Sequence, residues 1–119
     1  MTSRGRDRAL LAVTVAVQLA VLYWPRAAGE GLPYVDKLVH AAVFGAVAWA
    51  GRRAGVPHRV LVPLLVVQAV VSEVVQDRLL PGRSGDPADV VADLVGTGLG
   101  LLLAHRPGTS RRVRASWRA

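Results

Sequence analysis

Cysteine is absent from the sequence, and lysine and aromatic residues are scarce: there are one Lys, three Trp, two Tyr and one Phe. The absence of cysteine excludes disulfides, thiol chemistry and cysteine-based zinc sites. A soluble core usually contains more Phe, Tyr and Ile than this chain offers. Hydrophobic residues nevertheless make up 52% of the 119 residues. The length predicts one domain, and its composition predicts a strongly aliphatic one.

Charge is also absent from four stretches of the chain. The uncharged runs contain 17, 14, 13 and 11 residues and cover residues 9–25, 38–51, 60–72 and 94–104. A membrane-spanning helix needs about 20 apolar residues, with a lower limit near 17, so only the first run is long enough by itself. The other three reach that length if the polar residues at their borders belong to the same helices.

Proline and glycine divide the chain into four predicted helices. Turn signals lie at Pro25, 29–33, 51–57 and 81–85. The expected helices cover roughly residues 9–25, 36–52, 59–77 and 87–105. They lack the charged stripe that a soluble amphipathic helix carries along its length. The predicted fold class is therefore all-α, an integral membrane four-helix bundle.

The basic residues predict the orientation of this bundle. Eleven of the fifteen lie in the two tails and in the turn near residues 52–59, which share one side of a four-span topology. The positive-inside rule places that side in the cytoplasm. We therefore expect both termini to be cytoplasmic in a multi-pass protein of the bacterial plasma membrane. The expected organisation is a basic N-terminus at 1–8, a four-helix transmembrane domain at 9–105 and a basic tail at 106–119.

Two other interpretations start from the same positive charge. Arg4–Arg8 before an apolar stretch also occurs in a cleaved signal peptide, but Trp24-Pro25-Arg26 lacks the small residues of a cleavage site. A net charge of +7 is also found in nucleic-acid-binding proteins. Here the basic residues are confined to segment ends, which favours a topological role, and no nucleic-acid partner is expected.

Seven of the eight acidic residues fall on the opposite, outer side of the predicted topology. Six of them belong to the motifs Asp36-Lys37-x-x-His40 and Glu73-x-x-Gln76-Asp77, and to the set Asp86, Asp89 and Asp93. With a rise of 1.5 Å per residue, His40 and Glu73 lie about 6 Å inside their helices and Asp93 about 9 Å. Ionisable residues at membrane depth tend to face a bundle interior or a wet cavity. Their similar depth predicts one shared polar site.

Several of these residues also have structural explanations. Asp86 precedes a proline, as an N-cap residue often does, and Asp89 fits the second half of a capping box. Asp36 can cap the second helix or pair with His40 at i, i+4. His40 can also be a hydrogen-bonded residue of the core.

Capping does not explain Glu73 or Asp93. Acidic residues are unfavourable near a helix C-terminus, where Glu73 is expected, and Asp93 lies beyond the first turn of its helix. These two are the strongest functional candidates. Gln18 and Gln68 are expected to form interhelical hydrogen bonds. Small residues spaced four apart give two of the helices a face for close helix packing: Ala42, Ala46 and Ala50 on the second, and Ala92, Gly96, Gly100 and Ala104 on the fourth.

The polar motifs resemble those of VanZ-like membrane proteins over about residues 36–100. Asp36-Lys37-x-x-His40 with Phe44 is similar to the first motif, and Glu73-x-x-Gln76 with Arg83, Asp89, residue 93 and Gly96 is similar to the second. Relatives usually have Asn at position 93, so Asp93 adds a negative charge here. The resemblance implies a small multi-pass protein of the cell envelope. The founding member is associated with resistance to the glycopeptide teicoplanin, and most members have no established activity.

The first functional hypothesis is a binding protein. An outer polar cavity would bind a membrane lipid head group or a lipid-linked wall precursor. Lys37 and Arg83 suit a phosphate or carboxylate group. The proposed binding residues are Asp36, Lys37, Gln76, Arg83 and Asp89.

The alternative is a membrane-embedded enzyme that acts on a lipid head group. Its catalytic residues would be His40, Glu73 and Asp93, with a carboxylate pair for acid/base chemistry or His40 as a base oriented by Asp36. In a metal-assisted variant one histidine with carboxylates favours Mg or Mn over Zn. No ligand-spacing motif is present, so the sequence predicts neither a metal nor another cofactor.

A third interpretation is structural: the polar residues only hold the helices together, their burial offset by mutual pairing. A transporter is disfavoured, because ionisable groups lie near one membrane face alone. The sequence does not determine the oligomeric state.

Overall fold

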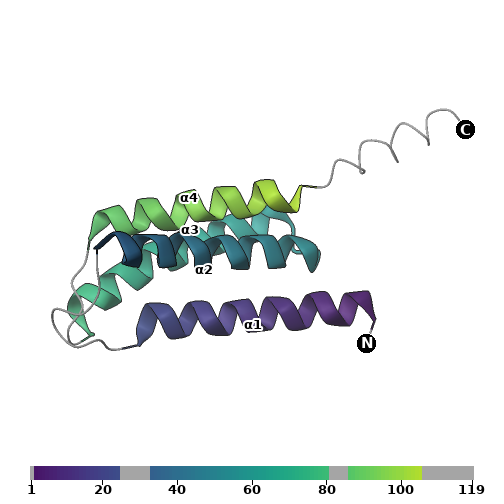
Figure 1. Cartoon of the computed structure of the whole chain (residues 1–119), viewed down its shortest axis with the longest axis horizontal. Coiled ribbons are helices and arrows are strands. Elements are labelled where there is room, and N and C mark those ends of the chain that lie inside the picture. Colours follow the sequence, from purple (N-terminus) through teal and green to yellow (C-terminus); the bar gives the residue numbers. More distant parts are fainter. Residues whose placement is uncertain (1, 25–32, 81–85, 106–119) are drawn as a thin grey trace, which may run out of the picture.

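The computed structural model describes residues 2–24, 33–80 and 86–105, and these form four helices. The helices are α1 (Ser3–Tyr23), α2 (Pro33–Arg53), α3 (His58–Arg78) and α4 (Pro87–Ala104). No strand occurs within the described residues, which confirms the predicted all-α class. Successive helices run in opposite directions, so α1 begins and α4 ends at the same end of the bundle (Figure 1). Arg83 and the predicted tail at 106–119 lie outside the described residues.

The predicted bounds are accurate for three helices and wrong for the first. α1 begins at Ser3, because the Thr2 side chain accepts a hydrogen bond from the Gly5 amide at 3.0 Å and caps the helix. The basic residues near the N-terminus therefore lie inside α1. The helix ends at Tyr23, so its uncharged part is 9–23 and falls short of the roughly 17 residues needed for a span.

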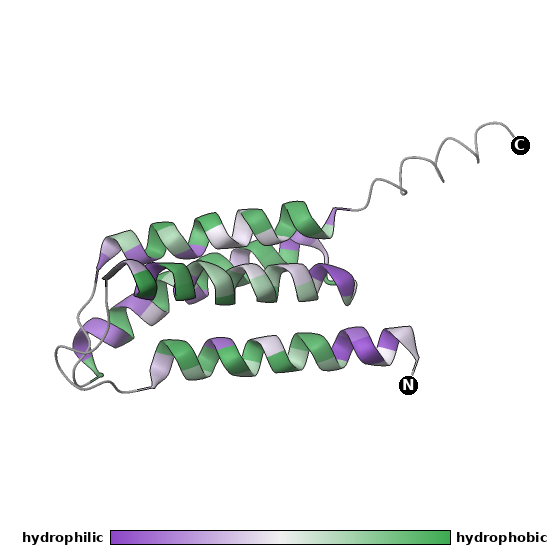
Figure 2. Cartoon of the chain, in the orientation of Figure 1, coloured by the Kyte–Doolittle hydropathy of each residue, from purple (hydrophilic) through white to green (hydrophobic). Residues whose placement is uncertain are grey.

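Two of the described helices are long and apolar enough to cross a membrane. They are α3 and α4, whose most apolar 18-residue windows have mean hydropathies of 1.7 and 1.5. Figure 2 shows hydrophobic residues along the middle of the helices and hydrophilic ones concentrated toward their ends. The prediction that residues 9–25 form a charge-free span is wrong, because α1 begins at Ser3 and ends at Tyr23. The prediction that the other helices reach spanning length with their border residues is confirmed, by length and composition, for α3 and α4.

The core is small and aliphatic around one aromatic ring. Phe44 and Leu22 are fully buried, and Val47, Leu61 and Leu65 pack in the same cluster. α2 and α3 each contact the other three helices, and the most extensive contact is between α2 and α4.

Glycine allows α2 and α4 to pack with their backbones in contact. A Cβ atom on Gly96 would overlap the Ala41 backbone, and one on Gly100 would overlap the Gly45 backbone. A Cβ on Gly45 would lie 2.9 Å from the Gly96 carbonyl oxygen. The predicted small-residue face of the fourth helix is therefore a real contact. On α2, however, the opposing backbone belongs to Ala41 and Gly45, which the alanine spacing did not identify.

Candidate functional site: a buried polar cluster at one end of the bundle

The start of α2, the end of α3 and the start of α4 meet at one end of the bundle. Asp86 is the N-cap of α4: its side chain accepts from the Ala88 amide at 3.0 Å, and Pro87 follows as the first helical residue. This confirms the capping prediction for Asp86. Asp36 lies within the first turn of α2, which begins at Pro33, so it does not cap that helix.

His40 and Asp93 form the buried centre of this cluster. His40 Nδ1 lies 2.8 Å from Asp93 Oδ1, and both side chains are completely buried. With Asp93 ionised, its oxygen accepts this hydrogen bond and Nδ1 carries the proton. Asp36 Oδ2 lies 3.8 Å from the other ring nitrogen, Nε2, so the predicted i, i+4 pairing of Asp36 with His40 is present, at a distance beyond hydrogen-bond range. The short hydrogen bond that orients the ring comes from Asp93, and the prediction had given that role to Asp36.

Lys37 links α2 to the start of α4. Its Nζ atom donates to Asp86 Oδ2 at 2.8 Å and lies 3.7 Å from Asp89 Oδ1. The hydrogen bond from Lys37, followed by that from the Ala88 amide, lowers the pKa of the Asp86 carboxyl below its usual value. Lys37 was predicted to bind an external anion, and in this structure it is engaged by two carboxylates of the protein.

Glu73 has a structural contact that the sequence did not predict. Its Oε1 atom accepts from the backbone amide of Asp86, so a residue of α3 satisfies the N-terminus of α4. In a capping box this acceptor would be Asp89, three residues after Asp86. Glu73 takes that place, and Asp89 turns toward Lys37 instead. The inference that capping cannot explain Glu73 is therefore wrong. Glu73 belongs to α3, but it caps the N-terminus of α4.

Gln76 is buried and faces α1. Its Nε2 atom donates to the Leu22 carbonyl oxygen at 2.9 Å, which ties α3 to the end of α1. The predicted interhelical bonds of Gln18 and Gln68 are confirmed, since Gln68 Nε2 donates to Gln18 Oε1 at 3.4 Å. Tyr23 joins them by donating its hydroxyl to Gln68 Oε1 at 3.1 Å. These amides form a separate helix-packing network.

Four buried polar atoms of the cluster have no hydrogen-bond partner among the residues described. They are His40 Nε2, Glu73 Oε2, Asp89 Oδ1 and Asp93 Oδ2. Buried polar groups are nearly always satisfied in folded proteins, and exceptions call for a ligand, an ion or water. The cluster thus combines a fixed imidazole with several carboxylate oxygens that can accept an additional partner. It can bind a cation or a hydrogen-bond donor, and it can accept a proton.

Comparison with protein-family models, curated proteins and solved structures found no match. The resemblance to VanZ-like proteins therefore stays a prediction. The functional roles predicted for the residues of the cluster likewise stay predictions.

Proposed function

We propose that this chain is a multi-pass membrane protein that binds the polar head group of an envelope lipid or lipid-linked wall precursor. Its termini would be cytoplasmic, and its polar cluster would face the outer leaflet. The observation that carries the proposal is the buried His40–Asp93 pair inside a bundle whose exterior is apolar. Ionisable residues at such depth are costly and typically serve a ligand or ion.

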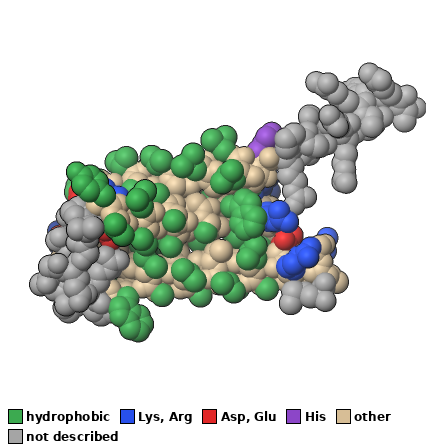
Figure 3. All heavy atoms as spheres, viewed as in Figure 1, with side chains coloured by type: hydrophobic (Ala, Val, Ile, Leu, Met, Phe, Trp, Pro, Cys, Tyr) green, Lys and Arg blue, Asp and Glu red, His purple; other side chains and the backbone are tan. Residues whose placement is uncertain are grey.

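The surface of the bundle supports a membrane location. Large hydrophobic side chains are exposed on all four helices, including Val17, Leu38, Val67 and Leu99. Only 33% and 28% of the apolar windows of α3 and α4 are buried, unlike core helices of a soluble protein. Figure 3 shows hydrophobic side chains over the middle of the visible face and charged ones near its ends. An exposed apolar surface of this extent indicates contact with lipid or a partner.

The position of the cluster supports recognition of a head group. It lies at the end where α2 begins and α4 begins, within the first turns of both helices. That depth corresponds to the boundary between head groups and acyl chains in the proposed topology. The unpartnered atoms of Glu73, Asp89 and Asp93 suit hydroxyl, amine or metal-bound groups. Lys37, about one-third exposed, adds a cation at the rim for a phosphate.

Lipids that copurify with the protein test this proposal. Mass spectrometry should find one lipid class enriched above the bulk membrane with the wild-type protein, and Glu73→Ala should lose that enrichment. Asp77→Ala is the matched control, because Asp77 is an exposed acid at the same end of α3. A bulk-like lipid profile from the wild type, or unchanged enrichment with a folded Glu73→Ala protein, would contradict the proposal.

A membrane-embedded enzyme is the second candidate, and the His40–Asp93 pair favours it. A general base usually has its second nitrogen held by a carboxylate, as His40 Nδ1 is held by Asp93. Nε2 then faces the cluster with its lone pair available. Conversion of the copurified lipid by the wild type, and not by His40→Gln, would establish catalysis. Enrichment without conversion would leave binding as the function.

A further inference from the structure

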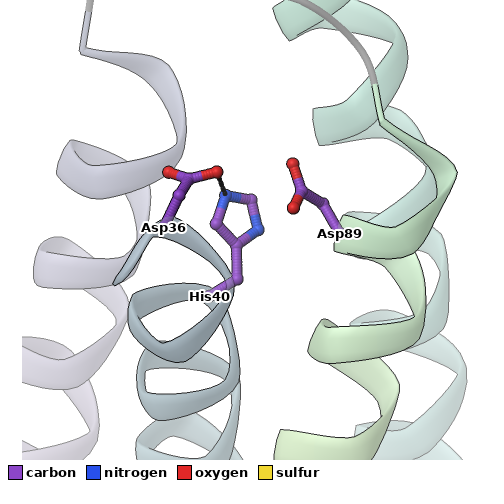
Figure 4. A group of neighbouring side chains, drawn as sticks. All are labelled: Asp36, His40 and Asp89. Carbon is purple, nitrogen blue, oxygen red and sulfur yellow. Dashed lines mark ion pairs between the residues drawn. The ribbon is translucent and has the colours of Figure 1, made fainter. Parts of the chain in front are cut away.

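Three polar side chains from two helices point toward one another near the start of α2 and α4 (Figure 4). They are Asp36 and His40 of α2 and Asp89 of α4, and each offers one ligand atom within 4.8 Å of the other two. Ligand atoms at this separation can reach one cation at roughly 2.0–2.2 Å after small side-chain rotations. The triangle formed by these three ligand atoms is thus small enough to hold a divalent ion.

The bonding of His40 provides a second, independent indication of a ligand. Its side chain is fully buried, and Nε2 has no hydrogen-bond partner in the described part of the chain. Asp93 holds Nδ1 at 2.8 Å and so leaves the lone pair on Nε2, on the side of Asp36. Metal-binding histidines almost always show this arrangement, with a carboxylate or carbonyl on the second nitrogen. Asp89 Oδ1 is likewise buried without a hydrogen bond from any described residue.

The charge of the cluster also favours a cation. Glu73 and five described aspartates lie at this end, and the described basic residues there are Lys37, Arg78 and, when protonated, His40. Lys37 is hydrogen-bonded to Asp86, and its distance of 3.7 Å leaves Asp89 only partly neutralised. Uncompensated carboxylates are costly in an apolar environment, and a divalent cation would offset their repulsion.

We propose that Asp36, His40 and Asp89 bind a divalent transition-metal cation, Mn²⁺ or Zn²⁺, with Asp93 as a positioning residue. The fixed imidazole nitrogen favours a transition metal over Mg²⁺ or Ca²⁺, which revises the preference for Mg or Mn drawn from the sequence, and the two carboxylates suit Mn²⁺ and Zn²⁺ better than softer ions. Three protein ligands leave coordination positions open for water or a substrate oxygen. The proposal rests on the geometry of these residues and does not require the head-group function.

The test is metal binding to tag-free, chelator-treated protein in detergent without added lipid. Equilibrium dialysis with Mn²⁺ or Zn²⁺ and elemental analysis should give about one ion per chain. Asp89→Asn and His40→Gln should weaken binding at least about tenfold, since each removes a ligand. Asp77→Asn removes the same charge outside the triangle and should bind as the wild type does. Equal affinities for Asp89→Asn and Asp77→Asn would overturn the site.

The remaining histidines provide a control for adventitious binding. His58 and His105 line a pocket of about 520 Å³ at the opposite end of the bundle, together with Asp7. The double variant His58→Gln/His105→Gln should retain the ion. Loss of binding in this variant would assign the metal to the opposite end and overturn the proposal.

Two measurements keep the test decisive if ligand variants fold poorly. Lys37→Met should bind the ion more tightly, on the order of threefold or more, because a positive charge next to Asp89 is removed. A merely destabilised protein would not gain affinity. Pulsed electron paramagnetic resonance of Mn²⁺ in the wild type should detect coupling to an imidazole nitrogen. Absence of nitrogen coupling, or binding below about one-tenth of an ion per chain, would refute the site.

The role of Asp93 is tested by a conservative variant. Asp93→Asn retains an oxygen that accepts from His40 Nδ1, whereas Asp93→Ala removes it. Loss of such a partner typically weakens metal affinity about 10–100-fold. Asp93→Ala should therefore fall in that range and Asp93→Asn should recover part of the loss. Equal affinity of wild type and a folded Asp93→Ala protein would show that Asp93 does not position the ligand.

Discussion

At the scale of single residues, the cluster depends on which group each polar side chain faces. His40 and Asp93 are both fully buried, and His40 Nδ1 is hydrogen-bonded to Asp93 Oδ1. Thr97 adds a hydrogen bond from its hydroxyl to the Asp93 carbonyl oxygen at 2.8 Å, within α4. The pair therefore links α2 to α4 as well as forming the centre of the site. Its removal should affect stability in addition to any ligand.

We expect Asp93→Ala to lower the free energy of unfolding by about 3 kcal/mol, because breaking a buried polar pair leaves its partner uncompensated. Asp93→Asn should cost less, since its side-chain oxygen still accepts from His40. Denaturation in detergent, followed by helical circular dichroism, measures both. Val95→Ala, at an exposed position of the same helix, serves as the control and should cost less than Asp93→Ala. Equal stability of Asp93→Ala and Val95→Ala would contradict the pairing.

At the scale of helices, the contact between α2 and α4 determines the geometry of the cluster. Asp36 and His40 lie on one of these helices, and Asp89 and Asp93 lie on the other. Their carboxylates reach the imidazole only because the backbones meet at Gly96 and Gly100. Small residues permit such close approach in membrane bundles, where dispersion and hydrogen bonds drive helix association.

Gly96→Ala should therefore separate α2 from α4 and destabilise the bundle, by about 1–3 kcal/mol as for overpacked cores. Gly98 is the matched control, because a Cβ there meets no atom within 4 Å. Gly98→Ala should be neutral or stabilising by up to about 1 kcal/mol through helix propensity. The melting temperatures of Gly96→Ala and Gly98→Ala, measured in the same detergent, test this prediction. Similar melting temperatures would show that the backbone contact between α2 and α4 does not stabilise the bundle.

At the scale of the whole molecule, two of the four described helices, α3 and α4, are long and apolar enough to span a membrane. α1 has charged residues in its first turns, and α2 carries Asp36 and Lys37 near its start. The ion pair between Arg53 Nε and Asp7 Oδ1, 3.5 Å apart, joins these two helices at the end opposite the polar cluster. In the proposed topology that end faces the cytoplasm.

The absence of cysteine makes this topology directly testable. The single substitutions Ser3→Cys, Ala54→Cys and Leu79→Cys place one thiol at the start of α1, directly after α2 and directly after α3. A membrane-impermeant maleimide on intact cells should label Leu79→Cys alone, and permeabilised cells should show labelling at all three. Labelling of Ser3→Cys in intact cells would reverse or abolish the topology. Release of the protein by carbonate extraction would exclude a membrane-spanning bundle.

Four helices, most of their bounds and the end at which the acidic residues gather could be predicted from the amino-acid sequence. Those features depend on local signals: charge-free runs, proline and glycine turns, and a capping aspartate at Asp86. The prediction failed at the start of α1, where Thr2 caps a helix that includes the N-terminal arginines. The packing of the helices was needed to show that Asp93 forms the short hydrogen bond to His40 and that Glu73 caps α4. Those partners come from different helices, and sequence spacing specifies neither the rotation nor the separation at which two helices pack.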